Sequence, residues 1–170
     1  MKIIYFFYQL FIALPILLVA TILTCTTIIV GTSIGNAHFW SYWPGKIWSM
    51  LFCYVLLLPV RVKRNPNVRK DTSYVFVANH QGAFDIFMIY GFLGHDFKWL
   101  MKKGIRKIPL IGKASESAGH IFVDKSGPKK IYATIMHARK VLTGGTSLVI
   151  FPEGSRSFTG HMGYFKRGAF

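Results

Sequence analysis

The first sixty residues of this chain carry almost no charge, and no other feature constrains its fold as strongly. Residues 1–60 contain two charged side chains, Lys2 and Lys46, and the stretch from Ile3 to Val30 contains none. That stretch is longer than the roughly 20 apolar residues that cross a bilayer. It also exceeds the apolar region of a cleavable signal peptide, which has about 7–15 residues. We therefore expect a retained membrane helix, in which Pro15 introduces a kink that lipid-embedded helices tolerate.

A second apolar segment, Ile47 to Val60, is shorter than a typical membrane span. It follows the aromatic run Phe39-Trp40-Ser41-Tyr42-Trp43, whose residue types are common at membrane interfaces. The pattern is compatible with a segment that returns through the bilayer, dips into it or lies along it. It is also compatible with a buried core helix.

Basic residues follow the second apolar segment at once: Arg61, Lys63, Arg64, Arg69 and Lys70. Positive charge beside a membrane segment favours the cytoplasmic side and anionic lipid headgroups. We therefore expect a membrane-associated helical part over residues 1–60. We expect a second domain over residues 61–170, on the cytoplasmic face of the inner membrane.

The formal charge of +15 raises the question of nucleic-acid binding. The sequence has no zinc-finger, homeodomain or single-strand-binding signature. Binding to phosphate-bearing membrane lipids therefore explains the positive charge better than binding to nucleic acid does. Cys25 and Cys53 lie inside apolar segments without metal-ligand spacing, and we expect neither a metal nor a cofactor. His120 and the remaining histidines outside the motif described below have no carboxylate fixed nearby in sequence. We expect them to lie on the surface or to be satisfied internally.

Beyond the basic linker, short apolar strands alternate with helical patterns. The expected strands are Tyr74 to Ala78, Lys98 to Met101, His120 to Val123 and Ser147 to Phe151. The expected helices run from about Ala83 to Leu93, from Ala114 to Ala118, and from Pro128 to the glycine pair at 144–145. This alternation predicts an α/β domain with a mostly parallel sheet.

The first expected strand ends in Asn79-His80-Gln81-Gly82-Ala83-Phe84-Asp85. The carboxyl edge of an open α/β sheet is where such folds place their chemistry, and a histidine near a carboxylate can act as a general base. His80 and Asp85 lie five positions apart, so one helix does not bring them together. They meet if His80 lies in a turn and Asp85 in the following first helical turn, with Gly82 permitting the bend. An ordinary surface turn has the same pattern.

The last expected strand ends in Phe151-Pro152-Glu153-Gly154-Ser155-Arg156-Ser157. Arg156 can grip a phosphate with its planar guanidinium, and the neighbouring hydroxyls can add hydrogen bonds. A capped helix start followed by a solvated arginine is the simpler alternative.

Taken together, these two segments resemble the glycerolipid acyltransferase family, most closely the bacterial 1-acyl-sn-glycerol-3-phosphate (lysophosphatidate) acyltransferases. The resemblance covers roughly residues 60–170 and implies a direct acyl transfer in which His80 is the base and Asp85 its partner. It also implies that acceptor binding falls to Glu153, Gly154, Ser155 and Arg156.

Two weaker blocks fit the same family. Gly119 to Lys125 resembles a block in which an arginine usually stands at the position of Lys125. Lysine keeps the charge but loses the bidentate guanidinium, and we expect it to contact the acceptor's phosphate. Met101 to Ile105 resembles a basic segment of the family, which makes Lys102 the implied stabiliser of the oxyanion. The family's fourth block would lie beyond Phe170, so we expect a domain truncated at its C-terminus.

The implied reaction moves an acyl chain from acyl carrier protein or coenzyme A to the sn-2 hydroxyl of lysophosphatidate, which forms phosphatidate. Another lysophospholipid or a lyso-aminolipid is an alternative acceptor. An alternative of another class is a non-catalytic basic membrane anchor that binds anionic lipid. The binding of such an anchor to anionic lipid would weaken with added salt and would not change when His80 or Asp85 is replaced.

Overall fold

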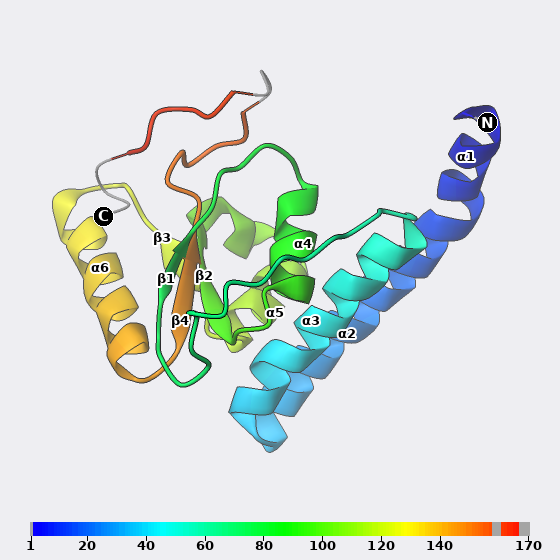
Figure 1. Cartoon of the computed structure of the whole chain (residues 1–170). Coiled ribbons are helices and arrows are strands. Elements are labelled where there is room, and N and C mark those ends of the chain that lie inside the picture. Colours follow the sequence, from blue (N-terminus) through cyan, green and yellow to red (C-terminus); the bar gives the residue numbers. More distant parts are fainter. Residues whose placement is uncertain (1, 158–160, 167–170) are drawn as a thin grey trace.

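A computed structural model describes residues 2–157 and 161–166 of the chain (Figure 1). In that part of the chain a nearly continuous amino-terminal helix consists of α1 (Lys2–Tyr8), the π-helical turn η1 (Gln9–Ala13) and α2 (Leu14–Ile34). It is followed by α3 (Ala37–Val55), β1 (Val75–Val77), α4 (Phe84–Phe92), β2 (Phe97–Lys102) and the 3-10 turn η2 (Lys103–Lys107). The remaining elements are α5 (Ile111–Ser117), β3 (Ile121–Val123), α6 (Pro128–Thr143) and β4 (Ser147–Ile150).

The strands that the structure describes form a four-stranded parallel sheet in the order β1-β4-β2-β3. Helix α6 lies on one side of this sheet, and α4 and α5 lie on the other, with α2 and α3 packed outside them (Figure 1). The predicted α/β class with a parallel sheet and an apolar amino-terminal helix is confirmed. Because the strands are parallel, all their carboxyl ends lie at one edge of the sheet.

The core joins the sheet to the helical hairpin of α2 and α3. Phe97 and Val149 of the sheet are fully buried, and the Tyr42 ring of α3 stacks on Tyr90 of α4 at a centroid distance of 5.8 Å. Lys98 of β2 donates from Nζ to Ser41 Oγ of α3 at 2.8 Å. The hairpin therefore packs directly onto the α/β layers.

The aromatic run and the second apolar segment up to Val55 form one helix, α3, and residues 56–60 lie beyond its end. Asn36 caps α3, since its side-chain oxygen accepts a hydrogen bond from the Phe39 backbone N–H. One face of α3 is buried: Ser41, Tyr42, Gly45, Ser49 and Cys53. Of the possibilities open from sequence, the packed core helix describes this face, while Ile47 and Tyr54 on the other face are exposed.

The free end of the hairpin is apolar on its outside and closed by hydrogen bonds on its inside. The hydroxyls of Tyr5 and Tyr8 donate to the carbonyls of Leu56 and Val55, at 2.8 Å and 2.7 Å. These bonds satisfy carbonyls at the end of α3 that have no partner within that helix. Within the described chain, the Lys2–Ile34 helix is long and apolar enough to cross a membrane, judged by length and composition alone.

Candidate active site

The structure brings His80 and Asp85 together at the carboxyl edge of the sheet. His80 lies in the loop after β1, and Asp85 lies in the first turn of α4. His80 Nδ1 and Asp85 Oδ2 are 2.9 Å apart, and the two side chains are 14% and 18% exposed. The pair is thus sheltered but open enough for a substrate to reach it.

Asp85 also fixes the backbone around the histidine. Its Oδ2 accepts hydrogen bonds from the N–H groups of Gln81 and Gly82, at 2.7 Å and 2.9 Å. The imidazole donates Nδ1–H to the same carboxylate in its neutral form, which leaves the lone pair on Nε2. This tautomer is the one that a general base requires.

The bend between His80 and Asp85 does not need a glycine. Gly82 has no positive φ, and a side chain added there would meet its nearest atom, the Phe84 backbone nitrogen, at 3.9 Å. The expectation that Gly82 permits the bend is therefore wrong. The hydrogen bonds to Asp85 hold the turn instead.

The loop after β4 supports His80 from behind. The His80 and Phe151 rings stack with centroids 4.1 Å apart and planes at 15°. The His80 backbone N–H donates to Glu153 Oε1, and its carbonyl accepts from the Ser157 N–H, each at 2.8 Å. Sequence reasoning missed the contacts made by Phe151 and Ser157, because no spacing in the chain indicates them.

Glu153 belongs to this loop, and it is buried, with 5% of its surface exposed. Its Oε2 accepts a hydrogen bond from the Gly163 N–H at 2.8 Å. The backbone N–H groups of His80 and Gly163 lower the pKa of this carboxyl below its usual range. The carboxyl group is therefore ionised at neutral pH, and both of its oxygens accept hydrogen bonds from the backbone of the same chain.

Three other residues expected to bind the acceptor follow Glu153 in the same loop. Gly154 has a φ of 70°, a left-handed conformation that favours glycine. Ser155 and Arg156 follow it and are exposed. The contacts predicted for these residues with a phosphate stay predictions.

Lys102 and Lys125 are exposed and lie at the carboxyl edge, on the far side of β4 from β1. Lys102 ends β2, and Lys125 follows β3 by two residues. Between them, Lys103 Nζ lies 2.7 Å from Asp124 Oδ2 and fastens η2 to the loop after β3. That lysine and the hydrogen bonds from Ser126 hold the pKa of Asp124 well below its usual range. The roles of Lys102 and Lys125 stay predictions.

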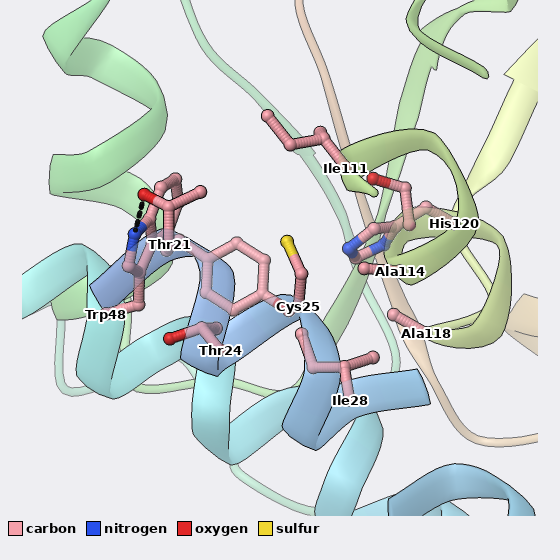
Figure 2. Close-up of a pocket in the computed structure, with 12 residues that line it drawn as sticks. Thr21, Thr24, Cys25, Ile28, Trp48, Ile111, Ala114, Ala118 and His120 are labelled. Atoms are coloured by element: carbon pink, nitrogen blue, oxygen red, sulfur yellow. Dashed lines mark hydrogen bonds between the residues drawn. The ribbon is translucent and has the colours of Figure 1, made fainter. Parts of the chain in front are cut away.

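A small apolar cavity of about 90 Å³ lies away from this edge, between α2, α3, α4 and α5 (Figure 2). Cys25, Ile28 and Ala114 line it, and the Trp48 Nε1–H donates to Thr21 Oγ1 at 2.9 Å on its wall. His120 also lines it. Within residues 2–157 and 161–166, no group of three or more histidine, cysteine or acidic residues is placed to hold a metal ion.

The buried His120 is satisfied internally, as the sequence predicted. Its Nδ1 accepts a hydrogen bond from the Trp99 backbone N–H at 3.2 Å. Burial, and after it the positive charge of Lys98, lowers the pKa of His120 to about 3. This imidazole stays neutral at physiological pH.

His120 makes the stability of the fold depend on pH. The unfolded chain binds a proton at this residue below about pH 6.5, whereas the folded chain does not until about pH 3. Its contribution is therefore complete above pH 6.5. This contribution to the free energy of unfolding falls by about 1.4 kcal/mol per pH unit as the pH drops from about 6.5 towards about 3.

His120→Asn, which keeps an acceptor near the Nδ1 position, should flatten the dependence of the unfolding free energy on pH between pH 7 and pH 4.5. The exposed His137→Asn serves as the control, and equal slopes for all three proteins would contradict the prediction.

Comparison with known proteins places this geometry in a family. The Acyltransferase family model matches residues 59–170. The chloroplastic 1-acyl-sn-glycerol-3-phosphate acyltransferase LPAT1 of Arabidopsis thaliana is 34% identical over 126 residues, which are 74% of this chain and 35% of that protein. The 1-acyl-sn-glycerol-3-phosphate acyltransferase of Helicobacter pylori is 33% identical over 118 residues, 69% of this chain and 49% of that protein. The chain thus spans between about a third and a half of the length of these curated relatives.

A solved structure has the same fold. The crystal structure of the 1-acyl-sn-glycerophosphate (LPA) acyltransferase PlsC from Thermotoga maritima superposes with a TM-score of 0.76. Its sequence is 23% identical, and the superposition covers 98% of this chain and 66% of that one. With the family match extending over more than half of its residues, this chain belongs to the Acyltransferase family.

Proposed function

We propose that this chain transfers an acyl group from a thioester donor, acyl carrier protein or coenzyme A, to the sn-2 hydroxyl of lysophosphatidate, and so forms phosphatidate. The observation that carries this proposal is the sheltered His80–Asp85 pair, with 2.9 Å between Nδ1 and Oδ2, at the carboxyl edge of the sheet. The names of the curated relatives support the choice of lysophosphatidate as the acceptor.

The chemistry follows from the tautomer that Asp85 imposes on His80. His80 Nε2 removes the proton from the sn-2 hydroxyl while the hydroxyl oxygen attacks the thioester carbonyl. Asp85 stabilises the resulting imidazolium. The tetrahedral intermediate then collapses to the new ester, and the departing thiolate takes the proton back from His80.

Positive charge at the same edge would serve the oxyanion and the acceptor. Lys102 is proposed to stabilise the oxyanion of the intermediate. Lys125 and Arg156 are proposed to hold the phosphate of the acceptor, with Ser155 and the backbone at Gly154 adding hydrogen bonds. The exposure of these side chains at the strand ends supports this assignment.

The apolar end of the hairpin is proposed to anchor the chain in the inner membrane, with the sheet on the cytoplasmic face. Exposed apolar side chains cover this end: Ile3, Ile4, Phe6, Phe7, Phe11 and Leu57. The first basic residue after α3 is Arg61, which keeps that end of the helix near the headgroups. A hairpin end that dips into the bilayer buries the apolar side chains and leaves Arg61 at the headgroups.

We propose that the boundary between residues 60 and 61 separates the membrane anchor from the catalytic part, although α2 and α3 also pack on α4 and α5.

A radiolabelled acyl-transfer assay tests the proposal. Membranes containing the protein receive each thioester donor with lysophosphatidate, with other lysophospholipids or with a lyso-aminolipid. We expect label in phosphatidate, at the sn-2 position. If label is transferred only to another acceptor, lysophosphatidate is not the acceptor, and the proposed function changes to acylation of that other lipid. Absence of transfer with every pair, together with salt-dependent vesicle binding that His80 variants retain, would favour the non-catalytic anchor.

A further inference from the structure

A buried carboxylate stands directly behind the proposed base. Glu153 is 5% exposed, so its oxygens face the protein interior rather than the open edge where an acceptor would arrive. Oε1 accepts the His80 N–H and Oε2 accepts the Gly163 N–H, both at 2.8 Å. The carboxylate therefore bridges two loops that are distant in the sequence.

The approach of Gly163 to this carboxylate is unusually close. A side chain added at Gly163 would place its Cβ 2.9 Å from Glu153 Oε2, closer than real Cβ contacts. The Lys166 N–H also donates to the Pro152 carbonyl at 3.0 Å, which holds the same segment against the loop after β4. Glu153 thus connects the His80 loop to residues 161–166 through one hydrogen bond to each.

The position of the His80 ring depends on the backbone that carries it. Phe151 fixes the plane of the ring by stacking, and Asp85 fixes its rotation through Nδ1. Asp85 also holds the backbone that follows His80, through the N–H groups of Gln81 and Gly82. The peptide groups of His80 itself are held by the hydrogen bonds from its N–H to Glu153 and from the Ser157 N–H to its carbonyl.

We propose that Glu153 is a positioning residue for His80, holding the backbone of the base in place for proton transfer, rather than a ligand of the glycerol. The proposal rests on the acyl-transfer function proposed above. It replaces the substrate contact that the family resemblance implied for this residue. It predicts that Glu153 governs the rate of the chemical step and not the affinity for the acceptor.

Glu153→Gln separates the two roles by steady-state kinetics. His80 N–H and Gly163 N–H donate to different oxygens of the carboxylate, and glutamine has a donating NH₂ group in place of one of these oxygens, so it cannot accept at both positions. We expect kcat to fall about ten- to a hundredfold with every acceptor and donor, while KM for lysophosphatidate stays within about twofold. A KM raised about tenfold with kcat near the wild-type value would overturn the proposal and restore the glycerol contact.

A second variant tests the position of His80 through a different contact, in case Glu153→Gln does not fold. A control variant makes the same chemical change outside the site. Phe151→Leu removes the ring stack and leaves the acceptor side of the loop intact, so it should also lower kcat without raising KM. Glu116→Gln makes the same chemical change at an exposed carboxylate that pairs with Arg106 on η2 and should leave both constants unchanged. A KM effect in Phe151→Leu as large as its kcat effect would also overturn the proposal.

Amide hydrogen exchange at His80 gives a readout that does not require turnover. Exchange should be faster in Glu153→Gln than in the wild type, because a neutral amide oxygen accepts more weakly than a carboxylate and the amide leaves one of the two donors without its acceptor. Unchanged exchange would contradict the proposal even in an active enzyme. Wild-type protein that acylates no lysolipid would instead refute the proposed function, so the two failures are distinguishable.

Discussion

His80→Ala should reduce acylation of lysophosphatidate to a small residual rate. Removing the imidazole takes away the group that accepts the hydroxyl proton, and general-base catalysis contributes about 10²–10⁴-fold. The residual rate should come from substrate binding and from oxyanion stabilisation by other groups. Initial rates in membranes with matched protein levels measure the loss.

The control for this variant is His137→Ala, which removes an exposed histidine from α6, away from the strand ends. It should retain wild-type rates and wild-type KM values. Because the His80 side chain stacks on Phe151, unfolding midpoints of both variants should be compared with that of the wild type. Near-normal turnover by folded His80→Ala would remove His80 from the mechanism.

Asp85→Asn is the second large effect that we expect. Asp85 Oδ2 accepts from His80 Nδ1 and from the N–H groups of Gln81 and Gly82, so this one atom sets both the tautomer and the turn. An asparagine oxygen can still accept these hydrogen bonds, but it brings no charge to stabilise the imidazolium. We expect kcat to fall about 10²–10⁴-fold with a small change in KM.

Asp71→Asn is the matched control, since Asp71 is an exposed carboxylate paired with Arg69 at 2.8 Å, outside the site. It should leave kcat unchanged. If Asp85→Asn keeps a rate within about threefold of the wild type, the carboxylate does not support a cationic intermediate and the pair is structural.

Much of the fold was predictable because the strands are short apolar runs and α6 has a periodic apolar pattern between Pro128 and the glycine pair at 144–145. The main local error concerns α5, which begins at Ile111 rather than near Ala114. Gly112 reads as a helix breaker in the sequence. In the structure it lies inside α5, where an added Cβ would meet the Arg106 carbonyl oxygen at 2.2 Å. Close packing on η2 requires a glycine there, and sequence periodicity carries no sign of that contact.

The candidate site was predictable where its parts are neighbours in the chain. His80 and Asp85 lie in one segment, so local geometry sufficed to bring them together. The contact of Glu153 with His80 depends instead on the pairing of β1 with β4, which aligns Val77 with Ile150. Both residues follow that pair by three positions. Spacing within a sequence does not reveal the register of two strands so far apart.

The most direct test of the central claim is rescue of His80→Ala by free imidazole, measured as acylation of the sn-2 hydroxyl of lysophosphatidate. Alanine leaves a ring-sized space between the Phe151 face and the Asp85 carboxylate. If an imidazole nitrogen at this place removes the hydroxyl proton, added imidazole should raise the rate about tenfold or more and should saturate. The same addition should leave the His80→Ala, Asp85→Asn double variant inactive. A rate that stays at background at every imidazole concentration, or a His80→Ala protein that needs no rescue, would contradict the claim.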